Sequence, residues 1–472
     1  QTVVIWPPAT DYAKNFCQKI AFPFTEMTIL VTATSGVAAT LINGETVHRA
    51  VYLNRKKHSV TIENIEAYKR VRLIVVDEIS MLPVPLLITL ESTLRQLSQV
   101  LDEERPYGGF HIVFSGDFCQ LNPIGKKNAI YGDLSLIQWH EYVNCYIELH
   151  GTYRFQQDPE WGKCLARFRV GKPEPQDFRM INQRVVYNGV TLDGSKIATN
   201  MQYATFHNRD RCAINTALFS GIIDHDPTKS IMVFSDNVTV DIGNGKKLPL
   251  QDKLTYWTEC AESSIDFGQQ STKMDPIVKL YSNSPMMLTE NVSVREGIAN
   301  GTQATFQKLM LKYGEKVSQT VVDGSKVDCV FASQISYIQL CHTSGTQRVF
   351  KLEPKSFDFH AHFPKPPSLW TSKSRTEKIR MSATQLPVVS NNATTGHKLQ
   401  GSTKESIFIT RFFYDTKNWN YVVLSRVRTR QGLFLKEPLD PSQDFTMDDS
   451  LVTMLTTFRQ QKILPLQDFV FQ

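Results

Sequence analysis

Apolar runs alternate with amphipathic stretches through the first third of the chain. Residues 84–100 place apolar side chains at helical spacing, and residues 11–20 and 35–42 are further predicted helices. Because strands and helices alternate, we predict a parallel sheet with helices on both faces, forming a first lobe over residues 1–150. The predicted strands are residues 2–6 (TVVIW), 28–34 (TILVTAT), 73–76 (LIVV), 112–123 (IVFSGDFCQLNP) and 143–149 (VNCYIEL).

The pattern changes twice after this lobe. Residues 151–230 and 386–472 again alternate helices with strands and are predicted to form a second lobe of the same kind. Residues 231–385 carry short β-prone runs separated by Gly, Asn, Asp and Ser turns, which predict a small barrel-like β insertion. Residues 52–70 are short, basic and polar, and we interpret them as a small insertion in the first lobe.

Composition narrows the class of protein only slightly. Of the 472 residues, 41% are hydrophobic and 21% charged, which is typical of a globular chain, and the net charge of +6 permits a nucleic-acid partner without requiring one. The eight cysteines form no CxxC pair, so we expect free thiols in a reducing intracellular compartment. No apolar stretch is long enough to span a membrane, and we expect a monomer without a membrane partner.

Two adjacent carboxylates follow the apolar run at residues 73–76. Asp77 and Glu78 come where the strand should end, which is the edge at which open α/β sheets bind ligands. A carboxylate there can hold a Mg²⁺ ion that bridges two phosphates, and its neighbour can accept a proton from attacking water. The alternative interpretation is a solvated acidic turn.

A phosphate-binding loop is missing from its expected place. Gly-Lys occurs at Gly125, Gly162, Gly171 and Gly245, but no Ser or Thr follows as GxxxxGK[ST] requires. The loop should lie at residues 7–10, where Thr10 aligns with the hydroxyl position but two prolines remove backbone donors. We therefore expect this copy to be impaired in nucleotide turnover, or its gene model to be incomplete at the amino end.

Further polar residues stand in short motifs along the chain. Gln120 follows the strand at residues 112–123, and its amide could sense a terminal phosphate; a plain polar turn is the alternative. Arg154 and Arg426 could each neutralise charge on a transferring phosphoryl group, although either one alone is more often a surface ion pair. Hydroxyl, amide and ammonium donors suited to a nucleic-acid backbone occur at Ser35, His48, Thr394, His397 and Lys398.

In this order, the motifs resemble those of the petite-integration-frequency (PIF) DNA helicases of helicase superfamily one. The likeness runs from about residue 27 to about residue 436, and residues 77–82 (DEISML) separate it from RecD-like relatives. Gly396 stands where the family usually has an apolar residue, and Asn122 where it often has proline. The motifs are residues 32–48, 75–82, 114–124, 151–161, 290–302, 394–403 and 421–428.

The resemblance implies an α/β fold of two RecA-like parallel-sheet lobes, of the P-loop NTPase type, with a small β-barrel-like insertion in the second lobe. It implies an ATP- and Mg²⁺-dependent 5′-to-3′ DNA helicase that acts on single-stranded and forked DNA, in the nucleus or mitochondrion if the chain is eukaryotic. The alternative is a non-catalytic scaffold that binds single-stranded DNA.

The resemblance also implies roles for individual residues. Asp77 would ligate magnesium, Glu78 would activate water, and Gln120, Arg154 and Arg426 would face the γ-phosphate. Nucleotide binding would involve Thr10, Asp77 and Gly401. Ser35, His48, Thr394, His397 and Lys398 would lie near DNA, and residues 55–57 would correspond to the strand-splitting wedge.

Overall fold

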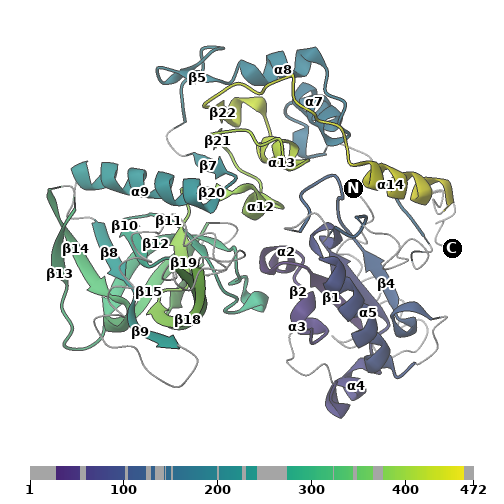
Figure 1. The fold of residues 1–472 in the computed structure, drawn as a ribbon, viewed down its shortest axis with the longest axis horizontal. Helices are drawn as coiled ribbons and strands as arrows, with labels where there is room; N and C mark the ends of the chain where they lie inside the picture. The colour runs from purple at the N-terminus through teal and green to yellow at the C-terminus, as the bar shows by residue number, and fades with distance from the viewer. Residues whose placement is uncertain are drawn as a thin grey trace.

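The protein folds into two parallel-sheet lobes and a β-rich insertion (Figure 1). The structure is a computed structural model, and within the part of the chain that it describes no helix is both long and apolar enough to cross a membrane. The described residues are 28–53, 60–100, 105–123, 129–132, 143, 145–149, 153–198, 201–225, 230–241, 274–322, 324–343, 348–364 and 376–461.

The first lobe is built on a four-stranded parallel sheet with the order β2-β1-β3-β4. Its central strand β3 ends at Asp77, which is level with Ala33 at the end of β1. Helix α5 packs on this sheet because leucines recur every three or four residues along it and are buried in the lobe's core. The elements are β1 (Ile29–Ala33), α2 (Gly36–Leu41), β2 (Glu45–Thr46), α3 (Val47–Ala50), α4 (Ile62–Tyr68), β3 (Leu73–Asp77), α5 (Val84–Ser98) and β4 (His111–Phe114).

The second lobe repeats this plan with the parallel order β20-β7-β21-β22. Its core gathers apolar side chains from α7, α13 and the sheet, with Trp161 and Trp419 fully buried. The elements are α7 (Pro159–Arg169), α8 (Pro175–Asn182), β5 (Val186–Tyr187), β6 (Val190–Thr191), β7 (Gln202–Thr205), α9 (Asn208–His225), β20 (Ala393–Thr395), α12 (Gly396–Leu399), β21 (Ile407–Ile409), α13 (Trp419–Leu424) and β22 (Leu433–Leu435).

The β insertion interrupts the second lobe between α9 and β20. Two of its sheets, β10-β8-β14-β13 and β16-β15-β12-β11-β19, share one apolar core, and β17-β18-β9 forms a third sheet. Among its described residues no pairing closes these sheets into a barrel, so the barrel stays a prediction. The strands are β8 (Ser230–Phe234), β9 (Asp236–Asp241), β10 (Ile277–Tyr281), β11 (Pro285–Leu288), β12 (Gln303–Leu311), β13 (Ser318–Val322), β14 (Ser325–Phe331), β15 (Ile335–His342), β16 (Val349–Leu352), β17 (Lys355–Pro364), β18 (Thr376–Gln385) and β19 (Val388–Ser390).

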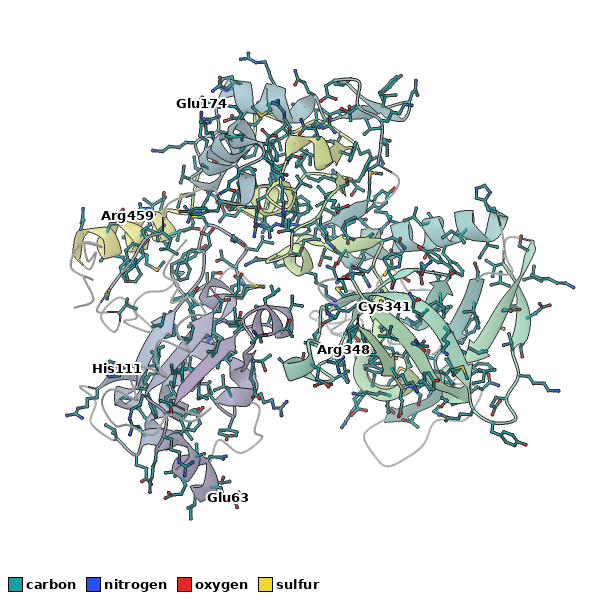
Figure 2. The ribbon with its side chains drawn as sticks, turned by 180° about the vertical axis from the view of Figure 1, so that it is seen from behind. Glu63, His111, Glu174, Cys341, Arg348 and Arg459 are labelled. Atoms are coloured by element: carbon teal, nitrogen blue, oxygen red, sulfur yellow. The ribbon has the colours of Figure 1, made fainter. Side chains whose placement is uncertain are left out.

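The last described helix, α14 (Asp449–Gln461), packs against the first lobe, although the sequence grouped its residues with the second lobe. Phe458 stacks on Tyr146 with 5.5 Å between ring centroids. Arg459 donates from Nη2 to Glu148 Oε1 over 2.6 Å, and Figure 2 shows it on this helix. The chain therefore leaves the second lobe and ends its described part on the first, which ties the two together.

The predicted two-lobed α/β architecture is confirmed. The strands predicted at residues 28–34 and 73–76 and the helices predicted at residues 35–42 and 84–100 are confirmed. The strand predicted over residues 112–123 is too long: β4 is His111–Phe114, and the chain turns after it. Residues 2–6, 7–10, 11–20 and 55–57 lie outside the described residues. Residues 143–149 are described in part, and no named strand covers that part. The boundaries predicted for the lobes and the insertion stay predictions.

Candidate functional site

Asp77 and Glu78 lie at the carboxyl end of β3, where the chain turns sharply. Glu78 adopts a left-handed conformation with φ 55° and ψ 41°, which is uncommon for a residue other than glycine. Two contacts hold the turn: Thr34 Oγ1 donates to the Glu78 carbonyl over 3.1 Å, and the Ile79 amide donates to the Ser115 carbonyl over 2.9 Å. Neighbouring strands therefore fix the direction in which the two carboxylates leave the sheet.

The Glu78 carboxylate faces the second lobe. Gln400 Nε2 donates to Glu78 Oε2 over 3.3 Å, and a Cβ added to Gly401 would lie 3.9 Å from Glu78 Oε1. Burial and the adjacent Asp77 charge raise the pKa of Glu78, while Gln400 and Arg426 oppose that rise. A carboxylate whose pKa is shifted towards neutrality is better suited to accept a proton from water.

Arg426, two residues after the end of α13, is 1% exposed and lies close enough to Glu78 for the two charges to interact. Burial, together with the charge of Arg154, lowers the pKa of Arg426 to about 10. All its described hydrogen bonds go to neutral groups, so no carboxylate is bonded to it and its charge is available to an anion in the site. The acceptors are the carbonyls of Val422, Leu399 and Ser402 and the hydroxyl of Ser425.

Arg154 is exposed and reaches the same place from the start of the second lobe. Its Nη1 donates to the Ser425 carbonyl over 3.4 Å, next to Arg426. Its charge is near enough to disfavour the charged form of Arg426, and an anion bound near both would relieve that effect.

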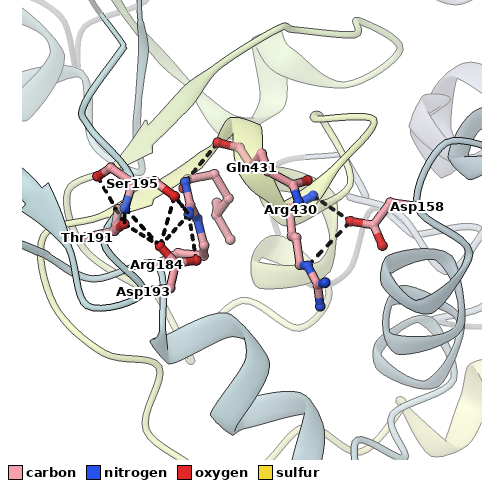
Figure 3. A network of polar contacts seen from close by, with 8 residues as sticks. Asp158, Arg184, Thr191, Asp193, Ser195, Arg430 and Gln431 are labelled. Carbon is pink, nitrogen blue, oxygen red and sulfur yellow. Dashed lines mark hydrogen bonds and ion pairs between the residues drawn. The ribbon is translucent and has the colours of Figure 1, made fainter.

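A polar network holds the segment that follows Arg426 (Figure 3). The Asp158 carboxylate accepts from the Arg430 amide over 3.0 Å. The buried Arg184 donates to the Gln431 carbonyl over 2.8 Å and pairs with Asp193. Asp158 also caps α7 by accepting from the Trp161 amide, so it joins the start of that helix to the segment that follows Arg426.

Gln120 follows β4 and approaches the junction from the first lobe. Its Nε2 donates to Asp117 Oδ2 over 3.3 Å, while its Oε1 is buried without a partner. Asp117 is 4% exposed and forms two hydrogen bonds with Arg169 of α7, over 2.8 and 3.1 Å. The sequence analysis did not predict the pairing of Asp117 with Arg169 or of Glu78 with Gln400, because no local pattern pairs residues so far apart.

The described residues fit a magnesium nucleotide. Carboxylates stand at the strand end, Arg426 has no carboxylate bonded to it, and the side-chain oxygens of Gln120 and Gln400 are buried without partners. No group of three His, Cys, Asp or Glu side chains within the described ranges could hold a metal alone. Phosphate and water would therefore complete the shell around Asp77, as Mg²⁺ prefers. Thr10 lies outside the described residues.

The five residues predicted to lie near DNA fall into two groups. In the first lobe, Ser35 caps α2 by accepting from the Ala38 amide, and burial lowers the pKa of His48 in α3. In the second, Thr394 is buried with no partner for its hydroxyl, and burial lowers the pKa of His397. No hydrogen bond described for these ranges joins the two groups.

Lys398 belongs to the second group and differs from the rest in being exposed. Neighbouring protein nevertheless surrounds its ammonium group, which lowers its pKa to about 8, and Arg211 adds to that effect. Asp275 partly offsets it. Burial is thus the main reason why Lys398 loses its proton more readily than an ordinary lysine, and a phosphate beside it would favour its charged form.

Comparison with known proteins matches residues 14–162 to the model of the PIF1-like helicase family. The ATP-dependent DNA helicases PIF1 of Emericella nidulans and of Saccharomyces cerevisiae are 23% and 24% identical, each over 86% of this chain and 53% of their own length. The zebrafish (Danio rerio) PIF1 is 24% identical over 93% of this chain and 59% of its own. The chain thus spans little more than half the length of these relatives.

Solved structures show a similarity to the same group of helicases. The Pif1 helicase from Bacteroides in complex with ADP-AlF3 and single-stranded DNA aligns with a TM-score of 0.60 and 19% identity, covering 94% of this chain and 90% of that one. The Candida albicans Pif1 helicase aligns with a TM-score of 0.61 and 19% identity, covering 94% and 91%. These alignments establish the fold. Together with the family model over residues 14–162 and the curated relatives, they show that this chain is similar to PIF1-like helicases in sequence and in fold.

Proposed function

We propose that this protein is an ATP-dependent 5′-to-3′ DNA helicase that unwinds duplex from a single-stranded tail. One observation carries the proposal: Gln400 of the second lobe donates to Glu78 of the first, and Arg426 donates to the carbonyls of Leu399 and Ser402, which flank Gln400 and Gly401. Hydrogen bonds therefore bring Glu78 and Arg426 to the same short segment where the lobes meet. Because the carboxylate comes from one lobe and the arginine from the other, both can contact the same nucleotide only when the lobes are together. Nucleotide binding can therefore be coupled to lobe movement.

The residue roles follow from chemistry and position. Asp77 would ligate Mg²⁺, and Glu78, with its raised pKa, would accept the proton of attacking water. Arg154 and Arg426 would neutralise charge on the γ-phosphate, because an anion relieves their mutual repulsion. The unpartnered oxygen of Gln120 could orient water or a magnesium-bound ligand, and Gly401 leaves space beside Glu78. Bound Mg²⁺ would screen the phosphates and polarise them.

DNA is the proposed polymer substrate. Among the matching structures one describes DNA unwinding at forked double-stranded DNA by two coordinating Pif1 helicases, and another holds single-stranded DNA. By likeness, Ser35, His48, Thr394, His397 and Lys398 would contact the strand. It stays a prediction that the protein acts as a monomer. A nuclear or mitochondrial location, if the chain is eukaryotic, is also still a prediction. The six cysteines that the structure describes are free thiols.

One feature of the sequence affects the expected rate of ATP hydrolysis. No Gly-Lys in it is followed by Ser or Thr, so a lysine and backbone donors for the β- and γ-phosphates are not evident. We therefore propose slow turnover for the chain as printed. The competing function, a scaffold that binds single-stranded DNA without turnover, would need none of Asp77, Glu78, Gln120, Arg154 and Arg426. The contacts of Glu78 with Gln400 and of Arg154 with Ser425, next to Arg426, support the catalytic proposal instead.

Strand separation tests the proposal. A duplex with a 5′ single-stranded tail should be separated slowly in ATP and Mg²⁺, and the same duplex with a 3′ tail should not. Glu78→Gln should stop separation while leaving affinity for single-stranded DNA unchanged. Separation of the 3′-tailed duplex, or separation that survives Glu78→Gln, would contradict the assignment.

A further inference from the structure

A buried ion pair joins the two lobes behind the proposed nucleotide site. Arg169, the last residue of α7, donates from Nη2 to Asp117 Oδ1 over 2.8 Å and from Nε to Asp117 Oδ2 over 3.1 Å. The Arg169 side chain is 23% exposed and that of Asp117 is 6% exposed. The two parallel bonds fix the planes of both groups, which is the strongest geometry for an arginine and a carboxylate.

The same carboxylate orders the loop that carries Gln120. Asp117 Oδ1 accepts from the Cys119 amide over 3.1 Å, and Asp117 Oδ2 accepts from Gln120 Nε2 over 3.3 Å. With its amide nitrogen held, Gln120 has its oxygen buried and without a partner. The direction of that oxygen thus depends on Asp117, whose own position depends on Arg169.

The second lobe holds this loop at a further point. Asn418, just before α13, donates from Nδ2 to the Gln120 carbonyl over 3.4 Å. Tyr421, in the same helix, is close enough for Asp117 to raise its pKa further, after burial. Two parts of the second lobe therefore hold the loop of Gln120. Arg169 of α7 acts through Asp117, and Asn418, just before α13, binds the Gln120 carbonyl directly.

We propose that Arg169 is a positioning residue that makes lobe closure and the orientation of the Gln120 amide a single event. When the lobes are together, Arg169 holds Asp117, and Asp117 holds Gln120 towards the nucleotide. When they separate, Asp117 loses its two strongest bonds and Gln120 is released. This inference rests on the proposed role of Gln120 and assigns Arg169 a part that neither the motifs nor the comparisons give it.

The pKa shifts of Asp117 and Arg169 indicate that both side chains are charged when they are paired. Burial alone would raise the pKa of Asp117, but the charge and hydrogen bonds of Arg169 outweigh it and hold that pKa below its usual range. Asp117 in turn raises the pKa of Arg169 against the effect of burial. Separating the lobes would break both hydrogen bonds of this pair and return the two charges to water, so the pair belongs to the closed arrangement.

The chain contains a matched control two residues away. Arg167, on the same helix, makes a similar two-bond pair with Asp177 of α8, with side-chain exposures of 26% and 0%. That pair lies wholly within the second lobe. Arg167→Gln therefore removes an equivalent ion pair from the same helix without touching the junction.

The first arm of the test measures lobe separation directly and needs no turnover. Nitroxide-bearing amino acids replace Ile62 in the first lobe and Tyr187 in the second, which are 79% and 72% exposed. Pulsed electron resonance should give one narrow distance for the parent and for Arg167→Gln, and a longer, broader distribution for Arg169→Gln. Arg169→Lys should be intermediate, because one ammonium cannot reproduce the two-bond geometry. Identical distributions for the parent and Arg169→Gln would overturn the closing role.

The second arm measures phosphate release with excess single-stranded DNA. Arg169→Gln should lower kcat by about tenfold or more while KM for ATP changes by less than about threefold, because the lost contact acts on orientation and not on binding. Arg167→Gln should leave both unchanged. Equal effects of the two variants would reduce Arg169 to a structural residue. Absence of hydrolysis in the parent would instead contradict the proposed function and the link to Gln120, while the distance measurement would still decide whether Arg169 closes the lobes.

Discussion

The indole nitrogen of Trp419 occupies the space that a Cβ on Gly396 would need. Gly396 begins α12, directly before His397 and Lys398, and Trp419 is fully buried with no partner for that nitrogen. The glycine, which departs from the residue type usual in the family, is therefore matched by a large side chain from α13. The absence of a side chain at Gly396 leaves the space that the Trp419 indole fills.

A double-mutant cycle should show this pairing. Gly396→Val should destabilise the protein by about 1–3 kcal/mol through overpacking. Trp419→Leu should cost about 2–5 kcal/mol through the cavity it leaves. The double variant should cost less than the sum, because each change relieves the other. Urea unfolding measures the three free energies, and additive values would show that the two side chains do not compete for the same space.

Glu78 should reduce stability at neutral pH. Its pKa is raised in the folded protein by burial and by Asp77, so the folded state holds its proton more tightly than the unfolded chain. The resulting penalty is present at neutral pH and disappears as pH falls from the raised value towards that of an ordinary glutamate. Glu78→Gln should therefore raise Tm at pH 7.5 and lose this advantage near pH 4. A stabilisation that is the same at both pH values would argue against the shift.

Replacing Arg154 and replacing Arg426 should have different effects on stability but similar effects on catalysis. Arg154 is exposed, so Arg154→Ala should change the free energy of unfolding by less than about 0.5 kcal/mol. Arg426→Ala strips the Val422, Leu399 and Ser402 carbonyls of a buried donor and should cost about 1–3 kcal/mol. Both variants should slow phosphate release, by up to about 10³-fold. Unchanged release in Arg154→Ala would remove that residue from the site.

Lys398 should make affinity for single-stranded DNA depend on both salt and pH. Its pKa of about 8 means that the ammonium charge is lost as pH rises from 7 to 9, so affinity should fall over that range. Lys398→Ala should lower the slope of log affinity against log salt by about 1, equally for all sequences, and should remove this part of the pH dependence. Fluorescence anisotropy measures both. Lys163→Ala, on an exposed ion pair in α7, is the control and should change neither.

Local patterns predicted the elements that carry the chemistry, and missed the contacts between lobes. β3 and α5 could be predicted because a run of apolar residues and a helical repeat of leucines each identify an element from its own sequence. The pairing of Asp117 with Arg169 could not, because 52 residues separate them and neither has a distinctive neighbourhood. The place of α14 could not be predicted either, since an amphipathic helix shows that it has a partner but not which lobe supplies it.

Phosphate release with excess single-stranded DNA tests the central claim most directly. It should be compared for the chain as printed, for a variant in which residues 7–10 are replaced by a GxxxxGK[ST] loop, and for that variant with Arg426→Ala. The account predicts slow release by the printed chain, DNA-stimulated release by the variant with the loop, and its loss when Arg426 is removed. Brisk hydrolysis by the printed chain that Glu78→Gln abolishes would show that another segment contacts the phosphates. No hydrolysis by the variant with the loop would contradict the assignment of this junction as a site of ATP turnover.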